Sequence, residues 1–166
     1  SRLSLKGEII LLDKQDRTTW NQELINQGNF YMDKAAFGNK MSSYHLEAAI
    51  SYEHCIAKTY EATNWLQILA YYDFLVEQAD SPVVKLNRVI AILKVHGPEI
   101  ALKSLDLIEQ KEKLKEYHFY HALLADIYTL LGQIVKAEKH LKQGIKLTNS
   151  EAEQKLLQDK ISALLN

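Results

Sequence analysis

Two histidines, His118 and His121, lie three residues apart in the sequence, among the aromatic residues Tyr117, Phe119 and Tyr120. On one helix this spacing would bring both imidazoles to the same face, where they could chelate a metal ion. A structural zinc site needs four ligands, and no third ligand with suitable spacing lies nearby. We therefore interpret the two histidines as a packed or surface pair and expect no bound metal.

Carboxylates give a second candidate for chemistry, because Asp73, Glu77 and Asp80 could share one helical face. Such a face is more often solvated than catalytic. The single cysteine, Cys55, lies in an apolar-periodic stretch and is interpreted as a buried structural thiol. Nucleotide-binding glycine loops, nucleophile elbows and the HExxH zinc motif are all absent from the sequence. We expect no enzyme activity and no cofactor.

The composition excludes other classes of protein. The chain has 166 residues, six glycines, two prolines, 20 basic and 21 acidic residues, and a formal net charge of −1. So few turn-forming residues argue against a β-sandwich or barrel. The near-neutral charge argues against DNA binding by the chain itself, which needs a basic surface. No apolar run is long enough to cross a membrane, and we expect a cytoplasmic protein.

The apolar spacing predicts helices from Asp16 onward. Residues 1–15 lack a helical period and are interpreted as a linker, leaving residues 16–166 as one helical domain. Asp16 is expected to cap a first helix that carries Trp20 and ends near Phe37, before Gly38 and Asn39.

Capping residues mark the later helix ends. We expect further helices to begin near Ser43, Asn64, Ser81-Pro82, Pro98, Tyr120, Ile134 and Ser150. Ser150 and Glu153 have the spacing of a capping box. The Lys/Glu-rich residues 109–116 are interpreted as the solvated end of a helix and a short loop. About eight helices are expected in total.

A tetratricopeptide-like repeat fits best over residues 121–149. In this match, Ala125 lies where the repeat has a small residue and Tyr128 lies where it has an aromatic one. Gly132 lies at the turn, and Ala137 lies where the two helices of the repeat touch. Two further matches, one ending at Pro82 and one over residues 85–109, are degenerate. The expected fold is all-α: a right-handed superhelical stack of antiparallel helix hairpins, a tetratricopeptide-like solenoid.

Two polar residues interrupt an apolar stretch of the helix that begins at Pro82. Asn87 and Arg88 follow Leu86 and precede Val89 and Ile90. Polar side chains beside a packed face can anchor neighbouring helices by hydrogen bonds, or they can line a binding groove. We favour anchoring, and both roles stay open at this point.

Six stretches, taken in order and with their spacing, resemble one family. They are Asp13-Lys14-Gln15-Asp16-Arg17 with Trp20, Tyr44 to Ile50, Trp65 to Leu69 with Tyr72-Asp73, Ser81-Pro82-Val83-Val84 with Leu86-Asn87-Arg88, Val95-His96-Gly97-Pro98, and His121 to Asp126 before Leu131-Gly132. This order is similar to that in the C-terminal domain of extracytoplasmic-function RNA polymerase sigma factors that carry a tetratricopeptide-like extension.

The resemblance implies a protein-interaction or regulatory module that acts in transcription initiation. The implied partners are the sigma N-terminal domains, core RNA polymerase or a regulator. Promoter DNA would be contacted only through N-terminal domains that are not visible in this sequence, and residues 1–15 would be the end of the linker from them. The candidate partner-binding or structural residues are Asp16, Arg17, Trp20, Asn87 and Arg88.

Two other functions stay open. The first is a free-standing tetratricopeptide scaffold that binds a peptide or protein and has no link to transcription. The second is an enzyme that uses His118, His121 or the Asp73 carboxylate, which would require a bound metal.

Overall fold

The computed structural model describes residues 4, 8–35, 42–109 and 111–165, and within these ranges the regular elements are helical. The bounds are η1 Leu12–Lys14 and η2 Arg17–Thr19, both 3₁₀ turns, then α1 Gln22–Ala35, α2 Ser43–Ile56, α3 Trp65–Gln78, α4 Pro82–His96, α5 Pro98–Asp106, α6 Lys111–Leu114, α7 His118–Leu130, α8 Ile134–Leu147 and α9 Glu151–Leu164. The all-α prediction is confirmed. The described residues form nine α-helices instead of about eight, and the additional one is the single turn α6.

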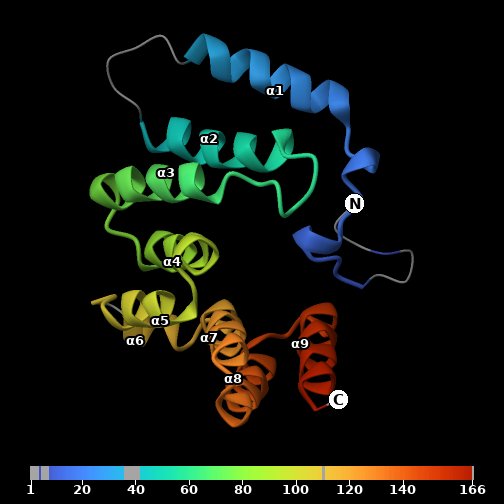
Figure 1. Ribbon diagram of the computed structural model, residues 1–166, viewed down its shortest axis with the longest axis vertical. Helices are drawn as coiled ribbons and strands as arrows, with labels where there is room; N and C mark the ends of the chain where they lie inside the picture. Colours follow the sequence, from blue (N-terminus) through green and yellow to red (C-terminus); the bar gives the residue numbers. More distant parts are fainter. Residues whose placement is uncertain (1–3, 5–7, 36–41, 110, 166) are drawn as a thin grey trace.

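The helices follow one another in chain order along an arc (Figure 1). Nearly every long helix packs on its neighbours in the sequence, from α1 on α2 to α8 on α9, while α5 packs on α7 past the short α6. Stacking of this kind is expected when a helix hairpin cannot bury its own apolar face. The superhelical handedness and the assignment of repeats stay predictions.

Two apolar clusters hold the arc together. The larger extends from α2 to α7 and includes the fully buried side chains of Leu46, Ile68, Leu86, Leu105 and Ile127. The smaller joins α7, α8 and α9 through Ala125, Ala137, Leu141 and Leu157. The small residues that the repeat pattern placed at 125 and 137 are therefore buried where α7 meets α8.

Several helix ends form as their capping residues predict. The Asn64 side chain accepts a hydrogen bond from the Gln67 amide, and the Ser81 hydroxyl accepts one from the Val84 amide. Gly97 ends α4 with φ +84°, after which Pro98 opens α5. Gly132 turns the chain between α7 and α8 with φ +70°. Both glycines adopt a backbone conformation that other residues disfavour.

The first helix begins later than predicted. Asp16 caps the turn η2, where its carboxylate accepts hydrogen bonds from the amide and hydroxyl of Thr18. Trp20 is extended, with ψ 145°, so the turn cannot continue into α1. The Asn21 side chain then accepts a hydrogen bond from the Leu24 amide at the start of α1. The predicted break at Gly38 and Asn39 lies outside the described residues.

Two later predictions also need correction. Residues 109–116 are not merely a solvated helix end, because they contain α6, whose Leu114 is buried. The Ser150 hydroxyl accepts a hydrogen bond from the Glu153 amide, but the Glu153 carboxylate accepts from the Thr148 hydroxyl instead of completing the capping box. The buried Thr148 hydroxyl competes for that carboxylate, and it accepts from the Ser150 amide in turn.

Candidate interaction surface

Arg17 connects η2 to the C-terminal end of α2 through hydrogen bonds. Its Nη1 donates hydrogen bonds to the carbonyl oxygens of His54, at 2.7 Å, and Ala57, at 2.6 Å. Its Nη2 lies 3.4 Å from the Thr63 hydroxyl oxygen, and its Cζ lies 5.1 Å from the centre of the Trp20 ring. A cation placed here satisfies carbonyls that a helix C-terminus leaves without partners. Arg17 and Trp20 therefore have a structural role at this joint.

Arg88 joins α4 to α3. Its Nε lies 2.6 Å from Oδ1 of Asp73, and the two side chains are 34% and 49% exposed. An ion pair this open contributes about 1 kcal/mol or less. Of Asn87 and Arg88, Arg88 forms the anchoring contact that the sequence predicted.

Asn87 lies on a different side of α4. Within the part of the chain that the structure describes, its half-buried side chain has no hydrogen-bond partner. Val83 and Ile90 occupy the same helical face and are 44% and 37% exposed. Lys94 continues this face and places its Nζ 4.9 Å from the centre of the Tyr60 ring.

We call the residues Val83, Asn87 and Ile90 the α4 stripe. A protein partner can cover exposed apolar side chains and form a hydrogen bond to a polar side chain that lies between them. Of the five candidate residues, Asp16, Arg17, Trp20 and Arg88 all have at least one partner within the chain, whereas Asn87 has no side-chain partner among the described residues.

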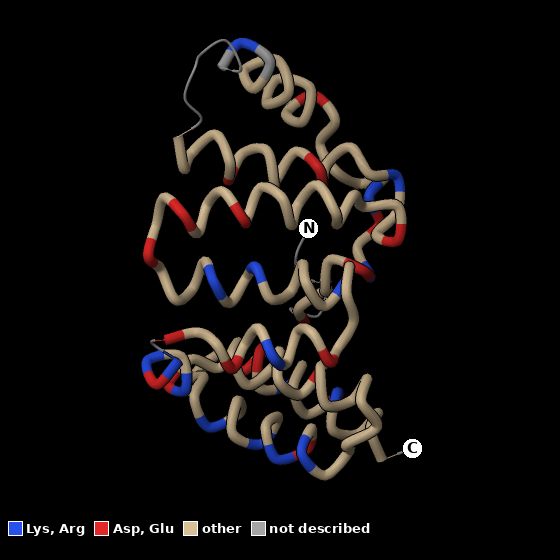
Figure 2. Tube along the Cα trace, turned by 60° about the vertical axis from the view of Figure 1, so that its left-hand side comes forward, with Lys and Arg blue, Asp and Glu red and all other residues tan. Residues whose placement is uncertain are grey.

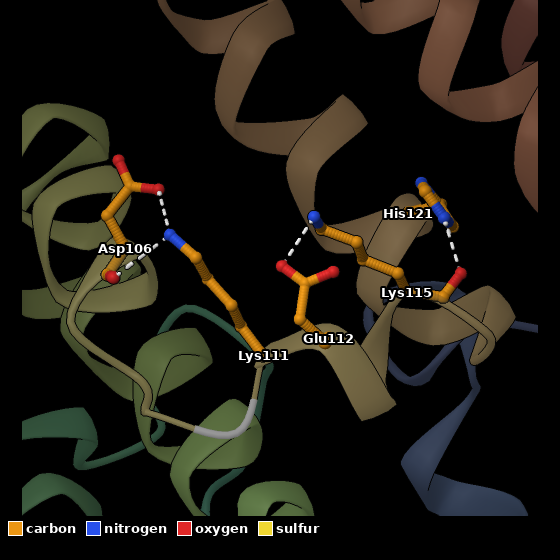
Figure 3. Close-up of polar contacts among 5 residues, drawn as sticks. All are labelled: Asp106, Lys111, Glu112, Lys115 and His121. Atoms are coloured by element: carbon orange, nitrogen blue, oxygen red, sulfur yellow. Dashed lines mark hydrogen bonds and ion pairs between the residues drawn. The ribbon is translucent and has the colours of Figure 1, made fainter.

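The predicted histidine pair is divided between two environments. His121 is buried, and its Nδ1 lies 3.0 Å from Nδ1 of His140 on α8. Its Nε2 lies 3.0 Å from the Lys115 carbonyl oxygen, as drawn in Figure 3. His118 instead lies 3.2 Å from the Glu153 carboxylate. The described residues contain no group of three or more His, Cys, Asp or Glu side chains that could hold a metal ion.

The contacts of His121 determine where the protons lie. Because Nε2 donates to the Lys115 carbonyl, Nδ1 of His121 is an acceptor, and Nδ1 of His140 must donate to it. Burial lowers the pKa of His121. Burial, with smaller repulsion from His121 and Lys139, lowers the pKa of His140 from 6.5 to about 4. Both rings are therefore neutral at neutral pH.

The role of His140 was missed by sequence reasoning, which treated it as an isolated residue on a lysine-rich face. The signal was present in the predicted turn at Gly132, because this turn makes α7 and α8 antiparallel neighbours. His140 stacks between His121 and Tyr128, with ring centres 5.3 and 5.5 Å away. This stack packs α7 against α8.

The three carboxylates that could have shared one helical face do not all lie in one helix, because α3 contains Asp73 and Glu77 but ends at Gln78, before Asp80. Asp73 pairs with Arg88, and Asp80 pairs with Lys85 at 2.5 Å. Glu77 is exposed on α3.

No helix among the described residues is long and apolar enough to span a bilayer.

The chain is similar to an uncharacterized protein of Rhizobium meliloti (strain 1021). The two are 33% identical over 153 residues, which make up 92% of this chain and 36% of the relative. The chain therefore spans about a third of the length of the curated relative it matches. No protein-family model matches the chain, and no solved structure matches it.

Proposed function

We propose that this chain is a protein-interaction module of a bacterial extracytoplasmic-function sigma factor, acting in transcription initiation through its α4 stripe. One observation carries the proposal: Asn87, in the family-like stretch Ser81 to Arg88, has unused hydrogen-bonding capacity between the exposed apolar side chains of Val83 and Ile90. A partner that covers these two side chains and bonds to the Asn87 amide would remove apolar surface from water.

The remaining family-like residues support a scaffold for this surface. Arg17 joins the first stretch to α2, and the Asp73–Arg88 pair joins the third stretch to the fourth. The relative from Rhizobium meliloti is long enough to carry further domains besides the matched part. In the proposal, such domains contain the promoter-binding parts, and this module contacts them, core RNA polymerase or a regulator.

In this proposal, other domains of the protein recognise promoter DNA. The formal net charge of −1 gives little attraction for a phosphate backbone. The isolated chain should therefore show no salt-sensitive, promoter-specific binding in fluorescence anisotropy at physiological salt. Such binding would argue against a module that acts through proteins alone.

The direct test is a binding measurement with variants of the α4 stripe. The chain is immobilised and exposed to core RNA polymerase and to the separate promoter-binding domains of an extracytoplasmic-function sigma factor. The variant Val83→Ser/Ile90→Ser removes apolar contact, and Asn87→Ala removes the amide. The control Leu66→Ser/Leu107→Ser alters side chains that are 66% and 81% exposed elsewhere.

We expect binding to at least one of these proteins, weakened about tenfold or more by either stripe variant and less than about twofold by the control. Circular dichroism should show the same helix content in all variants, and each variant should unfold cooperatively on heating. Absence of binding to every transcription protein, with capture of an unrelated peptide through the same stripe, would instead favour the free-standing scaffold. Equal effects of stripe and control variants would exclude the stripe as the interface.

A further inference from the structure

The solvent-facing side of α8 carries lysines at helical spacing. The helix buries Ala137, Leu141 and Gly144 on its other side, where it packs between α7 and α9. The exposed side forms an open hollow along the helix, lined by Val135, Glu138, Lys139, Lys142, Gln143 and Lys146. We call these six residues the α8 face. In Figure 2, basic positions recur along this lowest helix of the view.

The positive charge of the α8 face is only partly balanced. Lys142 lies 2.6 Å from the Glu138 carboxylate, one turn away on the same helix. Lys139 and Lys146 are exposed, and the described residues place no carboxylate within ion-pair distance of either. The whole chain has one more acidic than basic residue, so this excess of positive charge is local to α8.

The geometry of the α8 face suits a helical partner. Val135, Lys139, Lys142 and Lys146 recur every three or four residues, so they follow one side of α8 for roughly 16 Å. Val135 is 82% exposed and adds an apolar contact at one end. An amphipathic helix with one carboxylate per turn and an apolar residue at one end complements this arrangement.

Other anionic partners fit the α8 face less well. It has no arginine for bidentate phosphate contacts and no aromatic ring for base stacking, while the net negative chain repels a nucleic acid. A single apolar side chain is too little to anchor a helix in a lipid interface. We propose that the α8 face docks an acidic helical segment of a partner protein. The proposal does not depend on the sigma-factor assignment, because the α4 stripe lies on another helix.

The test measures binding of a fluorescein-labelled acidic peptide by anisotropy. The probe is an amphipathic helix of about 18 residues with one glutamate per turn on one side and a leucine at the end of that side. A second peptide replaces each glutamate with glutamine. The chain variant Lys139→Glu/Lys146→Glu is compared with Lys58→Glu/Lys103→Glu, which makes the same charge change at two exposed lysines outside α8. Duplex DNA and phosphatidylserine vesicles serve as competing probes.

We expect the acidic peptide to bind and the glutamine peptide to bind at least about tenfold more weakly. Lys139→Glu/Lys146→Glu should weaken binding by a similar factor, while the control double variant changes it less than about threefold. Absence of acidic-peptide binding, or equal loss in the two double variants, would overturn the proposal. So would tighter α8-dependent binding of duplex DNA or vesicles. Since core polymerase binding through the α4 stripe is measured separately, failure here leaves that result intact.

Discussion

At the residue scale, the five candidate side chains differ in whether their polar groups have partners within the chain. Arg17 and Arg88 form contacts within the chain, whereas Asn87 retains its capacity for an external partner. The sequence predicted that Asn87 and Arg88 are polar interruptions of an apolar helix, but both roles were possible for each. Which role each residue has depends on the neighbours that its side chain contacts. Helical periodicity alone does not determine these neighbours.

Arg17 gives the first prediction. Arg17→Ala removes two charge-assisted hydrogen bonds from the carbonyls that end α2, so the free energy of unfolding should fall by about 1–2 kcal/mol. Urea denaturation followed by circular dichroism measures this. Lys14→Ala is the control, because Lys14 is exposed at the end of η1, and it should change stability by less than about 0.5 kcal/mol. Equal effects of the two substitutions would contradict the structural role of Arg17.

The stack of His121 and His140 gives the second prediction. The folded pKa of His140 is about 4, below the 6.5 usual for histidine, so the unfolded chain takes up a proton first as the pH falls. Stability due to the neutral ring is complete above about pH 6.5 and is lost progressively as the pH falls toward 4. At pH 5 the expected loss is about 1–2 kcal/mol.

Denaturant unfolding at pH 7 and pH 5 measures this loss. His140→Gln cannot gain the proton and should reduce the difference in stability between the two pH values, to which the buried His121 also contributes. His96→Gln, an exposed residue at the end of α4, should leave the difference as in the unaltered chain. A pH dependence that His140→Gln does not reduce would contradict the account of this stack.

At the element scale, local chemistry predicted most helix boundaries. Asn64, Ser81 and Gly97 act through hydrogen bonds or backbone angles within a few residues, which a sequence contains in full. The start of α1 was placed too early because Asp16 is a good cap for either a 3₁₀ turn or an α-helix. The extended backbone of Trp20, whose ring packs against Arg17, decides between them.

Two glycines give the third prediction: replacement by alanine should raise the stability of the protein at one position and lower it at the other. Gly28 lies in the middle of α1, where an added methyl group meets nothing within 4 Å, so Gly28→Ala should stabilise the protein by about 0.5–1 kcal/mol. Gly132 also has open space, but its φ is +70°, so Gly132→Ala should destabilise by about 1 kcal/mol or more. Thermal unfolding compares the two. A stabilising effect of Gly132→Ala would refute the turn assigned to Gly132, and a destabilising effect of Gly28→Ala would contradict the open position assigned to Gly28 in α1.

At the scale of the whole molecule, the contacts of the N-terminal segment could not be inferred from the sequence. Glu8 pairs with Lys155 of α9, 147 residues away, while Arg17 contacts the end of α2. In Figure 1 this segment lies in the opening of the arc, between its two ends. Residues 1–15 lack helical periodicity, which predicted a linker but carries no information about contacts so distant in sequence.

The measurement that tests the central claim most directly is run-off transcription in vitro. Core RNA polymerase is combined with a full-length sigma factor that carries this module, with a version lacking residues 16–166, and with the Val83→Ser/Ile90→Ser variant. We predict that deletion changes promoter-dependent transcript output at least about threefold, because the contact made through the α4 stripe is lost, and that the stripe variant reproduces most of the change. Equal output from all three proteins would contradict a role for this module in transcription initiation.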